Sequence, residues 1–111
     1  MDERRKVDRV KVSLSVTWES ALATLQGEIT DLSVNGCFIL ADDKVSLGEL
    51  IKLEIQQPKS GHLYLGGKVI YQMPEIGFGV LFTDGREEDF QRLRWLVRAE
   101  LQRVGSIGLK K

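Results

Sequence analysis

The sequence has little of what secreted, membrane-bound or nucleic-acid-binding proteins depend on. Its single cysteine, Cys37, cannot form an internal disulfide, so nothing indicates an oxidising compartment. No apolar run approaches the roughly 20 residues that span a bilayer, and the charged start MDERRKVDRV does not resemble a signal peptide. Positive and negative side chains both number 16, which leaves no surplus charge to capture duplex nucleic acid or an anionic membrane. We therefore expect a cytoplasmic protein without membrane insertion.

Catalytic and metal-binding groups are equally sparse. His62 is the only histidine and follows a turn-like segment, where a surface position is expected. Cys37 opens the apolar run CFIL, a setting that favours a small buried hydrophobic residue over a nucleophile. Ser33 has no activating base nearby in the sequence, and no cluster has the spacing of metal ligands. The sequence therefore predicts neither an enzyme nor a metal or cofactor site.

What the sequence does contain is a strong alternation of apolar and polar residues. Its 111 residues, 42% hydrophobic and 29% charged, favour one soluble domain with a single core. Alternation with period two indicates strands, and we predict them at 10–18, 21–30, 37–40, 49–56, 62–73 and 78–82. In the fifth strand, Gly66 and Gly67 would allow the sharp bend of a barrel corner. Tyr71 is expected on the same face of that strand as Val69.

The period changes after TDG at 83–85. Asp84 is placed to cap a helix with Glu87 at its third position, and Gly105 is placed to end it. The apolar residues then fall at helical spacing, at Phe90, Leu93, Leu96, Val97, Leu101 and Val104. We expect this helix to plug the strand assembly or lie across it. Trp95, on its polar side, is a candidate contact with a second subunit or a partner.

Strands joined by short turns, without helices between them, favour an antiparallel arrangement. The prediction is therefore five to seven antiparallel strands, in a small barrel or a sandwich, followed by one C-terminal amphipathic helix. We place a flexible arm at 1–9, the folded domain at 10–105 and a tail at 106–111.

Two segments depart from this pattern. DLSVNG at 31–36 interrupts a strand with residues that bond their own backbone or adopt positive φ, so a plain turn would explain it. ERRKVDR at 3–9 precedes the first strand, and a solvated tail would explain it. Its cations are mainly arginines, however, whose planar groups bind phosphate oxygens or a guanine edge through paired hydrogen bonds. Because the arm leads directly into a strand, its arginines would be held against the folded domain.

Together, the two segments resemble the PilZ domain, a bacterial receptor module for cyclic di-GMP. The R-x-x-x-R arm is RKVDR at 5–9, preceded by a further arginine, and the D-x-S-x-x-G motif is DLSVNG. GFGVLF at 77–82 is similar to a strand of the family. The resemblance implies a six-stranded antiparallel β-barrel with a C-terminal α-helix. It also implies a single-domain receptor or adaptor that changes conformation on binding cyclic di-GMP and signals to a partner protein.

The resemblance further assigns ligand contacts. Arg5 and Arg9 would meet phosphate and the O6/N7 edge of guanine, and Arg4 would stack on a base or bind a second phosphate. Asp31 would accept hydrogen bonds from the guanine N1–H and N2–H2 groups, and Ser33 would bond phosphate or base.

Gly36 would keep the start of the next strand free of a Cβ, so that the ligand can approach the backbone. The roles of Asn35 and Cys37, the number of ligand molecules, the downstream partner and homodimer formation stay open. The family's usual contexts are motility, biofilm matrix and virulence control. The main alternative is a PilZ-like protein-interaction module that does not bind the nucleotide. Binding of nucleic acid through the arm is disfavoured, because acidic residues dilute its charge and no aromatic stacking platform accompanies it.

Overall fold

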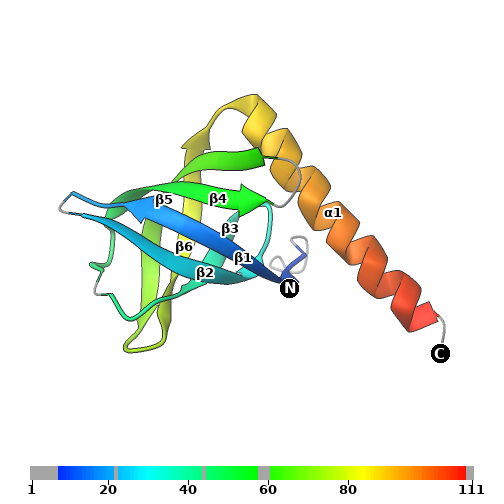
Figure 1. Ribbon diagram of the computed structural model, residues 1–111, viewed down its shortest axis with the longest axis horizontal. Coiled ribbons are helices and arrows are strands. Elements are labelled where there is room, and N and C mark those ends of the chain that lie inside the picture. Colours follow the sequence, from blue (N-terminus) through cyan, green and yellow to red (C-terminus); the bar gives the residue numbers. More distant parts are fainter. Residues whose placement is uncertain (1–7, 22, 44, 58–60, 110–111) are drawn as a thin grey trace, which may run out of the picture.

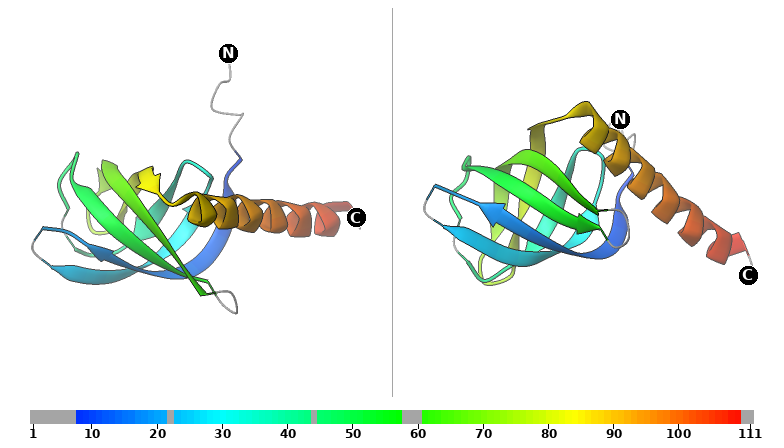
Figure 2. Two further views of the ribbon diagram at one scale, coloured as in Figure 1. Left: turned by 90° about the horizontal axis from the view of Figure 1, so that it is seen from above. Right: turned by 45° about the horizontal axis from the view of Figure 1, so that its top comes forward.

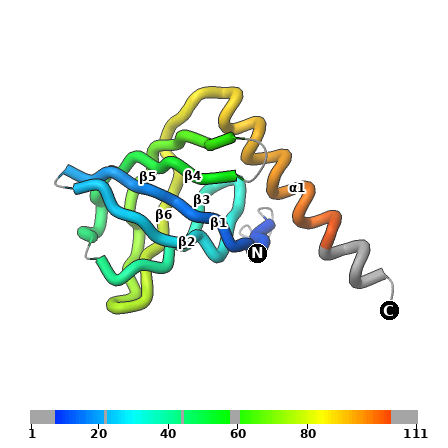
Figure 3. Tube along the Cα trace, viewed as in Figure 1, coloured from blue at the N-terminus to red at the C-terminus, as the bar shows by residue number. Residues whose placement is uncertain are grey.

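The computed structural model describes residues 8–21, 23–43, 45–57 and 61–109, with side chains up to residue 103. Within these residues six antiparallel strands close into a barrel and one helix follows (Figures 1 and 3). The strands are β1 (Val10–Glu19), β2 (Thr24–Leu32), β3 (Gly36–Leu40), β4 (Leu50–Gln57), β5 (Gly61–Met73) and β6 (Gly77–Gly85), and the helix is α1 (Glu87–Leu109). The order around the barrel is β1-β2-β3-β6-β5-β4. This confirms the predicted fold class and removes the sandwich alternative.

The inward-facing residues of the strands form one core. Successive side chains of a strand point to opposite faces, so one face of each strand contributes to the inside of the barrel. Val16 and Trp18 of β1, Ile29 of β2, Ile39 of β3 and Ile55 of β4 are all fully buried. The edge of the Trp18 ring packs on Phe78 of β6, with ring centroids 5.2 Å apart.

β5 departs twice from regular pairing with β6. The register shifts between Gly66 and Gly67, and again between Val69 and Tyr71. The first shift confirms the predicted bend, and a Cβ at Gly67 would lie only 2.4 Å from the Val80 side chain. The second shift makes the prediction for Tyr71 wrong. The irregularity turns Tyr71 to the outside of the barrel, where 44% of the residue is exposed.

The start of α1 differs from the prediction that Asp84 caps it. Asp84 still belongs to β6, where it pairs with Gly66 of β5. The carbonyl oxygen of Arg86 accepts hydrogen bonds from the N–H groups of Asp89 and Phe90 instead. Continued strand pairing therefore delays the helix, and the capping pattern in the sequence did not show how far β6 extends.

The end of α1 also differs from the prediction. The helix continues through Gly105 to Leu109, because a glycine inside a helix costs only about 1 kcal/mol relative to alanine. The prediction that Gly105 ends the helix is therefore wrong.

The sequence predicts that α1 plugs the barrel or lies across it, and this holds only for its first half, whose Leu93 and Val97 belong to the core of the barrel. Its first turns pack on one end of the barrel, where the buried Asp89 carboxylate accepts a hydrogen bond from the Tyr64 N–H at 3.4 Å. Leu93 and Val97 are buried, whereas Leu101 is 36% exposed, and the rest of the helix extends away from the barrel (Figures 1 and 2). No helix among the described residues is long and apolar enough to cross a membrane.

Candidate functional site

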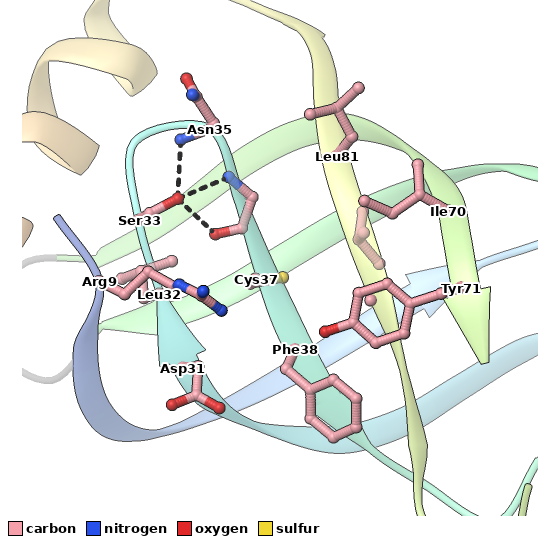
Figure 4. Close-up of a pocket in the computed structure, with 13 residues that line it drawn as sticks. Arg9, Asp31, Leu32, Ser33, Asn35, Cys37, Phe38, Ile70, Tyr71 and Leu81 are labelled. Carbon is pink, nitrogen blue, oxygen red and sulfur yellow. Dashed lines mark hydrogen bonds between the residues drawn. The ribbon is translucent and has the colours of Figure 1, made fainter. Parts of the chain in front are cut away.

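The DLSVNG segment forms the tight connection between β2 and β3. Asp31 and Leu32 still pair within β2, and the chain turns between Ser33 and Gly36. The Ser33 N–H donates to the Gly36 carbonyl oxygen at 2.9 Å. Ser33 Oγ accepts hydrogen bonds from the N–H groups of Asn35 and Gly36, both at 3.1 Å (Figure 4). The segment is therefore a turn, as its composition indicates, and its serine takes part in the internal bonding of the turn.

Ser33→Ala is expected to destabilise the protein through this turn. The hydroxyl is buried and accepts from two backbone N–H groups. Because a buried donor without an acceptor costs about 1–3 kcal/mol, we expect the free energy of unfolding in urea to fall by about 1–2 kcal/mol. Ser13→Ala is the matched control, since the Ser13 hydroxyl bonds Glu28 at the surface and its removal should cost less than about 0.5 kcal/mol. Equal losses in the two variants would contradict this role for Ser33.

A pocket of about 180 Å³ lies beside this turn. Figure 4 shows that it has two unlike sides. Arg9, Asp31, Ser33 and Asn35 form the polar side, next to the β2–β3 turn. The apolar side is formed by Phe38 of β3, Ile70 and Tyr71 of β5 and Leu81 of β6. The pocket therefore places charged and hydrogen-bonding groups within reach of a flat apolar surface.

The polar side joins two segments that are far apart in the sequence. Arg9 immediately precedes β1 and is exposed, while Asp31 is in β2 opposite Lys11 of β1. The Lys11 ammonium lies 2.7 Å from Asp31 Oδ1, and the Thr30 hydroxyl donates to Asp31 Oδ2 at 3.5 Å. An ionised carboxylate accepts about four hydrogen bonds, so Asp31 keeps acceptor capacity for a ligand.

The apolar side is built around Gly79 of β6. Phe38 and Tyr71 pair with Gly79 from its two sides, in β3 and β5. Their rings stack with centroids 6.0 Å apart and planes inclined by 23°. A Cβ at Gly79 would lie 2.2 Å from the Tyr71 ring, so glycine at this position lets the aromatic pair close over β6. No local pattern in the sequence indicates this aromatic pair, because it depends on the pairing of three strands.

Glycine is required at position 36 for a structural reason that is independent of any ligand. A Cβ at this position would lie 2.2 Å from the Val80 carbonyl oxygen. Only glycine therefore allows β3 and β6 to pair at the edge of the pocket. Of the predicted site residues, Arg9, Asp31, Ser33 and Gly36 all line the pocket, and Arg4 and Arg5 lie outside the described residues.

Cys37 of β3 is buried in the lining of the pocket and is not available as a nucleophile. Burial raises the pKa of its thiol well above the ordinary value, so the thiol stays protonated at neutral pH. Among the described residues no group of three or more histidine, cysteine, aspartate or glutamate side chains could hold a metal ion. The site is thus equipped for binding through charge, hydrogen bonds and stacking.

A second pocket, of about 450 Å³, lies between β4, β5 and β6. Leu50, Lys52 and Gly66 line it together with Thr83 and Asp84. It is larger than the pocket beside the turn but contains neither of the two motifs that the sequence analysis identified. A ligand bound there would contact neither motif.

Comparisons with known proteins give a consistent result. The family model described as "PilZ domain" matches residues 3–99. The PilZ domain of Escherichia coli YcgR, solved with cyclic di-GMP, has a TM-score of 0.78 at 14% identity, over 98% of this chain and 100% of that chain. MotI/DgrA, the Bacillus subtilis inhibitor of motility, has a TM-score of 0.74 at 20% identity, over 90% of this chain and 52% of that chain.

A third similar structure is the MrkH–cyclic di-GMP complex of K. pneumonia. Its TM-score is 0.74 at 16% identity, over 98% of this chain and 55% of that chain. This chain therefore spans about half the length of MotI and of MrkH. No curated protein matches the sequence. At these identities the structural likeness establishes the fold.

Proposed function

This chain belongs to the PilZ domain family, and from that premise we propose that it is a receptor for cyclic di-GMP that binds in the pocket beside the β2–β3 turn. The observation that carries the proposal is the convergence of Arg9 and Asp31, 22 positions apart in the sequence, on one pocket. PilZ domains are ligand-binding receptors rather than enzymes, and the site described above agrees with that role.

The pocket suits the chemistry of a cyclic dinucleotide, which has two phosphates and two guanines. The Arg9 guanidinium would pair with a phosphate or with the O6/N7 edge of guanine. The remaining acceptor capacity of Asp31 would take the guanine N1–H and N2–H2 groups. Ser33 and Gly36 would hold the turn in the shape that lets the ligand approach the backbone. Arg4 and Arg5, outside the described residues, are proposed as further phosphate or base contacts.

The size of the pocket bears on how the ligand would be enclosed. Small-molecule pockets usually measure roughly 300–1,000 Å³, and this one measures about 180 Å³. It would therefore hold one base and part of the backbone of the ligand, and residues 1–9 would cover the remainder. This closure falls mostly outside the described residues. Amide exchange with and without cyclic di-GMP tests it, and unchanged protection of residues 1–9 would contradict it.

Tyr71 extends the predicted site. Its exposed ring, supported by Phe38, offers a surface on which one guanine would stack. Since stacking of a base on an aromatic ring contributes about 1–3 kcal/mol, Tyr71→Ala should lower the affinity for cyclic di-GMP about 5- to 150-fold, as measured by titration calorimetry. Tyr71→Phe should retain most of the affinity. Tyr64→Ala, on the same strand but at the second pocket, is the control and should change little.

Binding selectivity tests the proposed function. Titration calorimetry should show micromolar or tighter binding of cyclic di-GMP, with much weaker binding of cyclic di-AMP and GTP, because only the first presents two guanines on a doubly charged ring. If none of the three nucleotides binds, the result would favour the alternative, a protein-interaction module. We further propose that the bound form signals from the cytoplasm to a partner protein.

A further inference from the structure

The outer surface of three neighbouring strands carries a contiguous group of apolar side chains. We call it the apolar face and define it by Phe38 and Leu40 of β3, Ile70, Tyr71 and Met73 of β5, and Leu81 of β6. Five of these six side chains are exposed by 38 to 48%, and only Phe38 is half-buried. Large hydrophobic residues exposed singly are ordinary, but a contiguous group marks an interaction site.

Strand pairing makes this group contiguous. Leu40 and Met73 both pair with Gly77 of β6, and Phe38 and Tyr71 both pair with Gly79. Leu40, Gly77 and Met73 thus form one row across the three strands, and Phe38, Gly79 and Tyr71 form another. The two rows are neighbours, because outward residues of a strand repeat every second position. At positions 77 and 79 the middle strand, β6, has no side chain, so the side chains of β3 and β5 meet above it there. The result is one apolar surface rather than separate exposed residues.

The charge on this face favours a second copy of the chain as its occupant. The strand pairing places two charged side chains of opposite sign on the outward side of these three strands, Lys68 next to Leu81 and Asp84 opposite Gly66. Two such faces can therefore meet without bringing many like charges together. The exposed side of α1 is different, since Arg94 and Arg98 flank Trp95 along the helix and would face the same arginines in a second copy.

The area is sufficient for a weak dimer. The six side chains expose roughly 500 Å², which is within the range of the largest patches on monomeric proteins. Two copies would then bury roughly 1,000 Å², the lower limit for a specific interface. Because buried area does not fix affinity, the dimer has to be sought over a wide range of protein concentrations.

We propose that the apolar face joins two copies of this chain, and that the second copy and cyclic di-GMP exclude one another. Four residues belong both to the face and to the pocket beside the turn: Phe38, Ile70, Tyr71 and Leu81. A ligand stacked on Tyr71 would cover part of the surface that the second copy needs. The exclusion rests on the proposed function, whereas the dimer does not. By linkage, the monomer binds the ligand more tightly than the dimer does, and the ligand shifts the equilibrium toward monomer.

Sedimentation velocity of the full chain over about 10–500 µM tests the dimer. The wild type should pass from monomer to dimer, and Met73→Glu, which lies on the face but outside the pocket, should stay monomeric with an unchanged near-UV circular dichroism spectrum. Trp95→Ala, on α1, should dimerise as the wild type does. A monomeric wild type at every concentration, or a Met73→Glu variant that still dimerises, would overturn the proposal. Loss of the dimer in Trp95→Ala would move the interface to the helix and overturn it too.

The ligand separates the two parts of the proposal. Saturating cyclic di-GMP should convert the wild-type dimer to monomer, and Met73→Glu should bind the ligand at least as tightly as the wild type. If cyclic di-GMP binds and the dimer persists, the exclusion is wrong. If the dimer forms and cyclic di-GMP does not bind at all, the proposed function fails and the dimer stands.

Discussion

Arg9→Ala should reduce the affinity for cyclic di-GMP about 100-fold, because a charge-assisted hydrogen bond contributes about 1.5–3 kcal/mol and 1.4 kcal/mol is a factor of ten. Arg9 lines the pocket and is exposed, so its removal should leave the free energy of unfolding unchanged. Titration calorimetry measures the loss. Three arginines are assigned to the ligand, and among the described residues Arg9 is the one that lines the pocket.

Two variants make this result specific. Arg9→Lys should recover only part of the affinity, because an ammonium keeps the charge but loses the planar pair of donors. Arg98→Ala removes an exposed arginine of α1 and should bind cyclic di-GMP as the wild type does. If Arg9→Ala binds within about twofold of the wild type, a difference of less than about 0.5 kcal/mol, Arg9 makes no ligand contact.

Trp18→Ala should lower the free energy of unfolding by about 3–5 kcal/mol, the range for truncating a large aromatic residue in a core. Trp18 is fully buried, and its ring contacts Phe78 across the barrel. Since domains of this size are stable by only about 5–15 kcal/mol, the variant should lose a large part of its stability. Urea denaturation monitored by far-UV circular dichroism measures the change.

Trp18→Phe is the matched control. The Trp18 indole N–H is buried without a hydrogen-bond partner among the described residues. Phenylalanine removes that unpaired donor while keeping an aromatic ring, so the loss of stability should be much smaller than for alanine. Equal losses for the two variants would mean that a polar contact of the indole, rather than its packing, stabilises the core.

The strands could be predicted from the sequence because alternation is a local signal. The fully buried positions of β1 and β4 are all apolar, and each pattern is read within one strand. Tyr71 could not be placed in this way. Its outward position depends on a register shift between β5 and β6, which is a property of two strands. The start of the helix was missed for a similar reason, because pairing with β5 keeps Asp84 in β6.

The polar and apolar sides of the pocket also differ in whether a local pattern in the sequence indicates them. Asp31 and Ser33 could be found because a spaced motif carries them, and the resemblance to the family joined them to the arginine arm. The aromatic side of the pocket has no such motif. Phe38 and Tyr71 meet only because both pair with Gly79, and the apolar face follows from the same three-strand arrangement.

The central claim is that cyclic di-GMP binds where the arm and the β2–β3 turn meet. A titration of the ¹⁵N-labelled protein with cyclic di-GMP, followed by amide chemical shifts, tests it most directly. We expect large changes at Arg9, Asp31, Asn35 and Tyr71, and small ones at Lys52 and Thr83 of the second pocket. Changes centred on the second pocket, or an unchanged spectrum at millimolar ligand, would contradict the account.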